Sequence, residues 1–553
     1  MKSAGLEKQK KDMWTVVTFG ALVLYALFLL YPLISMLIKS VLSPQGDFTL
    51  AAFKKFFSSK FYYGTVVNSI MVTVSTTICA ILLSVPLAYI LNTVKIKFAP
   101  TIQILILLSS VSAPFIGAYA WILLLGRSGV ITTFFKNVFG IQTPDIYGFS
   151  GILLVLTLQL CPLIYMYVSG ALKTVDSSLI EAAESMGCTG VKKMFKIVGP
   201  LILPTILAGS LLVFMRALAD FGTPMLIGEG FRTIPVLIYS EFISEMGEDD
   251  SFAAATSVMV VIFATSVFLV QKFVAKRKAY TMSSLRPMKI KKEKGIKNIL
   301  AHLFVYGYII LAFMPQLYVI YTSFLKTSGK IFVKGYSIQS YVTAFSKVGD
   351  SIINTFTLAL SALLIIVFLA VLIAYVTVRR PNAATNILDV LTMFPYIVPG
   401  SILGIALLTA FNKQPVMLSG TAFILVLSFV IRRLPYTIRS SSATLHQISI
   451  TTEEAAVSLG ASQFKTFTNV TLPEMLPGVI SGAVLSWLSI LTELSTSILL
   501  FTIATRTMTI AVYTEVLRGN YGTAAALSTI LSCITVITLL LFFKLTGKKE
   551  LDM

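Results

Sequence analysis

The side chains best placed to do chemistry in this sequence are three ionisable groups inside strongly apolar stretches, Arg216, Asp220 and Glu493. Arg216 and Asp220 are four residues apart, which on a helix places them on one face, where they can pair. Glu493 lies at a broadly corresponding place in the second half of the chain, in the stretch Leu-Thr-Glu-Leu-Ser at 491–495. Ionisable groups in apolar surroundings are costly, so each indicates a function or a specific partner.

Two interpretations of these charges remain open. In the first, Asp220 and Glu493 face each other across a translocation pathway, together with Arg216, and favour a cationic substrate. In the second, Arg216 neutralises Asp220, and Glu493 bonds to neighbouring hydroxyl groups. Two further arginines, Arg432 and Arg433, are expected near the inner end of another apolar segment, with their charged heads reaching its surface.

Motifs of known catalysts are missing from the sequence. The four cysteines form no Cys-x-x-Cys pair, and the two histidines, His302 and His446, are isolated. There is no H-E-x-x-H or G-x-S-x-G pattern, and no G-x-x-x-x-G-K-[ST] loop that could cradle ATP phosphates. The sequence therefore predicts no catalytic residue, no metal ligand and no cofactor, and a protein that is not an enzyme.

A polar stretch that occurs twice narrows the function further. Each copy contains Glu-Ala-Ala, with a glycine six residues and a proline nineteen residues after the glutamate. The copies consist of Glu181, Ala182, Ala183, Gly187 and Pro200, and of Glu454, Ala455, Ala456, Gly460 and Pro473. The two glutamates are 273 positions apart in a chain of 553 residues. One copy would fit an ordinary connector, but two with the same internal spacing indicate paired docking loops for another protein.

The residue types predict how each copy folds. Asp176 or an adjacent serine can cap a short helix in the first copy, and Ser449 or Thr451 can do so in the second. Glutamate and alanine favour the helix, and the glycine then permits a sharp turn. The proline suits the first turn of the following helix, where a missing N–H costs least.

These loops must be positioned by membrane-spanning helices. Hydrophobic residues make up 56% of the chain and charged residues only 12%, against about 25% charged in soluble proteins. Apolar runs of about 20 residues without alternation predict helices and not a barrel. The fold class is therefore an all-α polytopic membrane protein. Twelve spans are expected, at about 14–41, 67–92, 101–125, 150–173, 200–221, 252–274, 299–324, 352–378, 386–411, 418–440, 474–500 and 523–545.

The distribution of charge predicts that both termini are cytoplasmic. Lysine and arginine gather in the loops predicted inside, whereas the predicted outer loop 222–251 carries Glu241, Glu245, Glu248, Asp249 and Asp250. The net charge of +20 is explained by this bias, so no nucleic-acid partner is expected. The most basic loop, 275–298, is predicted to be a cytoplasmic linker whose charge can also hold it at anionic lipid headgroups.

The two halves also match outside the loops. Asn68 precedes Tyr89 by twenty-one residues, as Asn354 precedes Tyr375. A repeat with the same span parity is parallel, and its axis along the membrane normal leaves a pathway between the halves. The expected domains are a first half at 1–274 with its loop at about 176–199, the linker at 275–298, and a second half at 299–553 with its loop at about 449–472.

The paired loops resemble a known family. The pattern E-A-A, three residues, G, nine residues, I-x-L-P is similar to the cytoplasmic loop signature of permease subunits of binding-protein-dependent ABC importers. Val470 replaces the isoleucine in the second copy, and Gly199 replaces the leucine in the first. The resemblance implies two fused type I importer permease halves of about six helices each, in the cell membrane. It also implies two copies of a separate cytoplasmic ATPase subunit, docked on the two loops, and an external or periplasmic substrate-binding protein.

The resemblance extends to a substrate group. Residues 219–224 and 492–500 are similar to fused permeases of the ferric iron importer group, which implies iron transport. Thiamine, 2-aminoethylphosphonate and polyamines are alternative substrates within the same class of importer. A secondary transporter of six plus six helices shares the parallel repeat and is a more distant alternative. It would need neither an ATPase nor paired glutamate–alanine loops.

Overall fold

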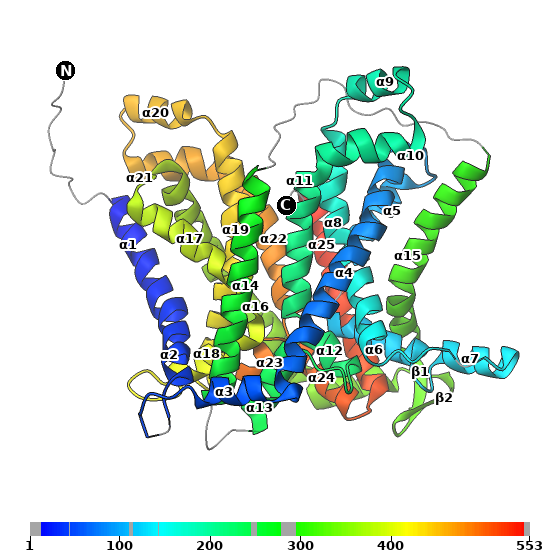
Figure 1. The fold of residues 1–553 in the computed structure, drawn as a ribbon. Helices are drawn as coiled ribbons and strands as arrows, with labels where there is room; N and C mark the ends of the chain where they lie inside the picture. The colour runs from blue at the N-terminus through cyan, green and yellow to red at the C-terminus, as the bar shows by residue number, and fades with distance from the viewer. Residues whose placement is uncertain are drawn as a thin grey trace.

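The protein is a bundle of long, roughly aligned helices, shown in Figure 1. The computed structural model describes residues 13–43, 45–109, 114–141, 143–244, 251–277 and 295–546. The basic N-terminal residues, most of the predicted linker and the acidic residues 245–250 lie outside this range. The helices α9 and α20 project from one end of the bundle, which we call the loop end; the other is the opposite end (Figure 1).

In the first half, the helices that line up with the predicted spans are α1 (Met13–Tyr25) with α2 (Tyr31–Ser40), α4 (Lys60–Thr93), α5 (Ala99–Ser109) with α6 (Pro114–Leu125), α8 (Phe149–Lys173), α11 (Gly199–Ala219) and α14 (Ser251–Arg277). A π-helical turn, Ala26–Leu30, joins α1 to α2. The shorter helices are α3 (Ala51–Ser58), α7 (Val130–Phe139), α9 (Ser177–Ser185), α10 (Gly190–Lys193), α12 (Gly222–Ile227) and α13 (Ile234–Ser244).

In the second half, the corresponding helices are α15 (Ile296–Ser323), α16 (Gln339–Arg379), α17 (Ala383–Ile397) with α18 (Gly400–Phe411), α19 (Ala422–Gln447), α22 (Leu472–Leu491) and α25 (Tyr521–Thr546). The shorter helices are α20 (Ile450–Ser458), α21 (Gln463–Thr466), α23 (Ser497–Leu500) and α24 (Met508–Leu517). A small antiparallel hairpin of β1 (Leu325–Ser328) and β2 (Ile331–Tyr336), which was not predicted from the sequence, follows α15.

The number of spans agrees with the sequence. Among the described residues, ten helical segments are long and apolar enough to cross a membrane by length and composition, one of which is Phe115–Phe139 with α7 included, and the bent pair of α17 and α18 makes eleven. Helix α19 has 26 residues, enough to cross at about 1.5 Å per residue. It carries Arg432, Arg433 and Arg439, which make it less apolar than the others. With α19 included, the number of candidate spans is consistent with the twelve expected.

Three of the predicted spans are wrong in detail. The span at 386–411 is two helices that meet at 112°, because Val398 is extended before Pro399, which disfavours a helical conformation at the preceding residue. The span at 474–500 ends at Leu491, and α23 forms a separate short helix. The span at 418–440 continues to Gln447, which places Arg432 and Arg433 in its middle. The prediction that these two arginines lie near the inner end of the helix is therefore wrong.

The two halves are interlocked by their first helices. Trp14 of α1 packs against Tyr375 of α16 and Phe467, with ring centroids 4.3 and 4.9 Å apart. Similarly, Tyr306 of α15 in the second half donates a hydrogen bond of 3.1 Å to the carbonyl of Lys97, in the connection between α4 and α5 of the first half. Each half thus contributes its first helix to the packing of the other.

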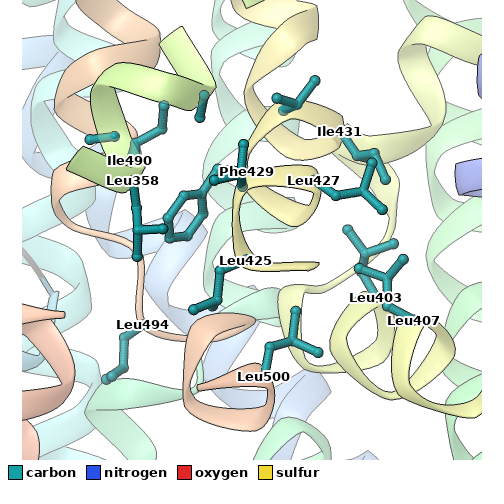
Figure 2. Packing of buried hydrophobic residues seen from close by; sticks show 14 of the residues in the cluster. Leu358, Leu403, Leu407, Leu425, Leu427, Phe429, Ile431, Ile490, Leu494 and Leu500 are labelled. Atoms are coloured by element: carbon teal, nitrogen blue, oxygen red, sulfur yellow. The ribbon is translucent and has the colours of Figure 1, made fainter. Parts of the chain in front are cut away.

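The largest hydrophobic core lies in the second half and extends into the first. Figure 2 shows Phe429 of α19 beside Leu358 of α16 and Ile490 of α22, and Leu403 and Leu407 of α18 on the other side of α19. The same cluster includes Phe115 and Phe221 of the first half. One continuous hydrophobic core therefore contains side chains from both halves and holds the two halves together.

Small residues allow α19 and α22 to approach closely. Ser440 donates a hydrogen bond of 2.7 Å to the carbonyl of Gly478, and the Thr437 and Ser486 hydroxyls are 2.9 Å apart. A Cβ atom added to Gly482 would lie 2.5 Å from the Cα atom of Thr437. Glycines four residues apart are a common means of close helix contact in membranes.

We predict that Gly482→Ala lowers stability by about 1–3 kcal/mol, because the added methyl group overpacks this contact. The midpoint of thermal unfolding of the purified protein in one detergent measures the effect. The matched control is Gly170→Ala in α8, where a Cβ atom would meet nothing within 4 Å. Equal midpoints for the two variants would contradict the close contact.

Candidate functional site

The two repeated loops form short helices at the loop end of the bundle. Helices α9 and α20 each have nine residues and are 273 positions apart. Asp176 caps α9 by accepting a hydrogen bond of 2.8 Å from the N–H of Ser178, and Ser449 caps α20. Gly187 and Gly460 end these helices with φ angles of +79° and +89°, which favour glycine. The predicted helix, cap and turn are therefore confirmed in both copies.

Part of each loop helix is available to a partner. Glu181, Ala182, Glu454 and Ala455 are exposed, whereas Ala183 is buried and Ala456 half-buried. The residues before the two glycines, Met186 and Leu459, are also equivalent, and they are 79% and 90% exposed. An apolar side chain held out at the same place in both copies is typical of a contact surface.

Each loop helix is connected to the next span through a π-helical turn. The turns are Met194–Val198 and Phe467–Thr471, again at equivalent positions. Pro200 and Pro473 lie in the first turns of α11 and α22, as predicted. Turns of this kind often occur at functional sites. The loops and spans are therefore joined by short, matched, irregular segments.

The two loop helices are anchored differently. Glu453 of α20 accepts hydrogen bonds from Arg379 Nε at 2.8 Å and from the Tyr375 hydroxyl at 3.1 Å, which ties α20 to α16. In α9, Ile180 occupies the position equivalent to Glu453. Instead, Glu184 of α9 pairs with Lys193 of α10 at 2.7 Å. Helix α20 is thus fixed to a span of its own half, whereas α9 is fixed to the helix that follows it.

Glu493 is the centre of a buried ion cluster. Its carboxylate accepts a hydrogen bond of 2.6 Å from Arg432 Nη1, and it also pairs with Arg433. The Glu493 side chain is 2% exposed and each arginine side chain 13%. We call these three residues the arginine cluster. Arg432 also donates to the Thr496 hydroxyl at 3.0 Å, so α19 is bound to the segment that follows α22.

Asp220 and Glu493 occupy equivalent positions and make equivalent backbone contacts. Asp220 accepts a hydrogen bond of 2.9 Å from the N–H of Thr223, and Glu493 accepts one of 3.1 Å from the N–H of Thr496. Each carboxylate therefore accepts a backbone N–H at the start of the short helix that follows its span. Helix α11 ends at Ala219 and Asp220 is extended, so Arg216 and Asp220 do not share a helix face.

Two predictions about these charges are therefore corrected. Among the described residues, no ion pair joins Arg216 to Asp220. Glu493 is neutralised by guanidinium groups, with the Thr496 hydroxyl bonded to Arg432 and not to the carboxylate. The carboxylates that the sequence suggested as a facing acidic pair are each used inside their own half, by a helix end or by arginines.

Arg216 makes a polar contact between the two halves through its side chain. It is exposed, and its Nη2 atom donates a hydrogen bond of 3.3 Å to the Tyr436 hydroxyl of α19. Arg433 lies 5.9 Å from the ring centroid of Tyr436, and Tyr396 contacts the same ring edge-on. The surroundings of Tyr436 therefore contain more positive than negative charge.

The partners of Glu493 were not predicted from the sequence, although one signal was present. Pro162 and Pro435 lie inside α8 and α19, 273 positions apart. This spacing aligns Gln159 with Arg432, so the second half has a charge where the first has an amide. In the described part of the chain, His, Cys, Asp and Glu side chains form no group of three that could hold a metal ion.

We predict that Glu493→Gln destabilises the protein strongly, by about 3–5 kcal/mol, because it leaves two buried guanidinium groups without a counter-charge. Asp220→Asn should cost far less, because an asparagine oxygen can still cap Thr223. Thermal unfolding of both variants in one detergent compares them. A Glu493→Gln variant as stable as Asp220→Asn would show that the arginine cluster contributes little.

Comparison with known proteins gives a consistent picture. The family model described as "Binding-protein-dependent transport system inner membrane component" matches residues 49–280 and 362–546. The chain is 31% identical over 473 residues to the "Ferric transport system permease protein FbpB" of Actinobacillus pleuropneumoniae, which covers 83% of this chain and 67% of the relative. It is 32% identical over 436 residues to a protein from Haemophilus influenzae named "Putative ferric transport system permease protein FbpB 1", covering 76% and 68%.

A shorter relative matches less than half of the chain. The "Putative 2-aminoethylphosphonate transport system permease protein PhnV" of Salmonella paratyphi A is 26% identical over 239 residues. The match covers 43% of this chain and 89% of the relative. Two ranges matched by one family model, and a relative about as long as one range, agree with the internal duplication.

Proposed function

Because the chain belongs to the family of inner membrane components of binding-protein-dependent transport systems, we propose that its two halves form the translocation pathway of an ATP-driven importer. A separate ATPase supplies the energy, and an external binding protein delivers the substrate. The observation that carries this proposal is the matched pair of loop helices at one end of the bundle (Figure 1). A transporter that needs no second subunit has no use for two such helices.

Two ATPase copies fit the geometry of the loop helices. Each helix presents Glu-Ala at its surface and an exposed apolar side chain, Met186 or Leu459, before its glycine. The small alanines permit close approach of a partner, and the apolar side chain gains stability when it is buried. Equivalent surfaces require equivalent partners, so a homodimer of ATPase subunits is the simplest occupant.

The connections of the loop helices explain how a movement would reach the membrane. A displacement of α9 is passed through α10 and the π turn to α11, the helix that carries Arg216. A displacement of α20 acts on α22 through its own π turn, and on α16 through Glu453 and Arg379. We infer that ATP-driven closure of the ATPase dimer displaces α9 and α20 at the same time. The helices connected to them then move, and the contact between Arg216 and Tyr436 opens.

The same proposal fixes the orientation in the membrane. The loop end must be cytoplasmic, because ATP and the ATPase are there. Lysines in and around α9 and α10 support this orientation, since cytoplasmic loops are enriched in basic residues. They are Lys173, Lys192, Lys193 and Lys196. Both termini are then cytoplasmic as well.

We predict that replacing Glu181 and Glu454 together by alanine uncouples ATP hydrolysis from uptake. The assembled importer in proteoliposomes should hydrolyse ATP without substrate accumulation, because the ATPase loses its two contact carboxylates. Glu474→Ala is the matched control, an exposed glutamate outside the loop helices in the first turn of α22. Wild-type uptake by the double variant would exclude the docking role of the two glutamates.

For the substrate, we propose ferric iron. Support comes from the two similar proteins named as ferric transport permeases, each of which this chain matches over about three quarters of its length or more. The contacts of Asp220 and Glu493 do not support a bare cation, because neither carboxylate is free to bind one. We infer that the iron crosses with accompanying anionic ligands.

A second candidate, 2-aminoethylphosphonate, is favoured by the same charges. Arg216 and the arginine cluster combine three guanidinium groups with one carboxylate. Guanidinium groups bind phosphate and phosphonate oxygens well. No contact at this place favours thiamine or a polyamine, both of which are cations.

Uptake of labelled Fe(III) and labelled 2-aminoethylphosphonate by cells expressing the complete importer separates the candidates. We predict uptake of iron and none of the phosphonate. In addition, Arg216→Gln should lower uptake of the transported compound about tenfold or more, which corresponds to roughly 1.4 kcal/mol of lost charge interaction, and Arg216→Lys should retain more. Equal uptake by the two variants would show that the charge of Arg216 does not act on the substrate.

A further inference from the structure

Helix α7 lies outside the bundle. It follows α6 at the opposite end, and Figure 1 shows it lying across the direction of the spans and projecting away from them. None of its ten residues is buried. The corresponding connection of the second half, between α18 and α19, contains no helix among residues 412–421. The first half thus carries an additional element that does not contribute to the core.

The sequence of α7 is divided into an apolar and a polar face. At about 100° of rotation per residue, its apolar side chains fall within one half of the helix circumference. These are Val130, Ile131, Phe134, Phe135, Val138 and Phe139. The other half carries Thr132, Thr133, Lys136 and Asn137. A helix of this kind needs an apolar surface along one side only.

The apolar face is not covered by the protein. Phe134, Val138 and Phe139 are 54%, 58% and 58% exposed. The phenyl rings contact one another, with centroids 5.7–6.1 Å apart, and so form one continuous patch. Ile131 alone packs partly against the core of the first half. Such a patch requires an apolar environment outside the chain.

The segments that flank α7 are held to the bundle. Arg127, just before the helix, pairs with Glu229 at 2.9 Å and with Asp145 at 3.4 Å. The Thr143 hydroxyl donates to the Thr132 hydroxyl at 3.3 Å. Gly140 ends the helix in the left-handed conformation, with φ +65°. The helix is therefore held in its crosswise position from both of its ends.

We propose that α7 is an interfacial helix, whose apolar face lies in the leaflet at the opposite end of the bundle. The lipid is the occupant because Ile131, in the middle of the apolar face, packs against the core of the first half, so the exposed remainder of this face lies next to the membrane-spanning helices. Amphipathic helices of this type lie about 5–10 Å into the boundary between headgroups and acyl chains. Lys136, on the polar face, then meets water and lipid phosphates. The helix anchors the first half alone at this surface.

Tryptophan scanning tests the proposal in the full-length protein, in nanodiscs of phosphatidylcholine. Phe134→Trp places an indole on the apolar face, and Asn137→Trp places one on the polar face of the same helix. Val138→Trp provides a second apolar position if the first variant folds poorly. The fluorescence of the unsubstituted protein, which has three tryptophans, is subtracted from each variant. Brominated acyl chains report contact with lipid, and acrylamide reports contact with water.

We expect brominated lipid to quench most of the added fluorescence of Phe134→Trp and Val138→Trp, and acrylamide to quench that of Asn137→Trp. Equal quenching of both faces by acrylamide would overturn the proposal, because the apolar face would then be in water. Protection of Phe134→Trp from both quenchers would also overturn it, since another protein would then cover the face. None of these outcomes depends on the transported substrate or on the ATPase.

Discussion

A carboxylate buried in a membrane protein needs a counter-charge, and Glu493 has two. Its pairing with Arg432 and Arg433 connects the middle of α19 to the end of α22. Because water is excluded at this place, the three residues are stable only together. The same carboxylate accepts the N–H of Thr496, which lies between the end of α22 and the start of α23. The ion cluster therefore determines where a span ends and how two spans are held in register.

The two halves share the same order of elements, as expected from a duplication, but they differ in residue type at particular equivalent positions. Loop helices, π turns, prolines and capping carboxylates recur 273 positions apart. Within this shared order, Gln159 is equivalent to Arg432, and Ile180 to Glu453. The second half thus has buried ion pairs where the first has an amide or an alkyl side chain. The halves can bind identical partners at their surfaces and still differ in internal stiffness.

Features that depend on neighbouring residues could be predicted from the sequence. The loop helices, their caps and the glycine turns involve contacts within about ten residues, and all were predicted correctly. The partners of Glu493 could not be predicted in this way, because Arg432 is 61 positions away. The end of α11 at Ala219 was also not predicted, because the sequence stays largely apolar on both sides of Asp220. The break is visible in the backbone, where the N–H of Thr223 donates to the Asp220 carboxylate.

The exchange of first helices has a consequence for how the protein is made. Trp14 and its partner Tyr375 are 361 positions apart in the chain. At a synthesis rate of about 5–20 residues per second, roughly 20–70 s pass between the emergence of one and of the other. During this interval α1 is already in the membrane without the surface on which it finally packs. The newly made first half must therefore tolerate an unfinished state, with its leading helix resting in lipid or against the insertion machinery until the second half arrives.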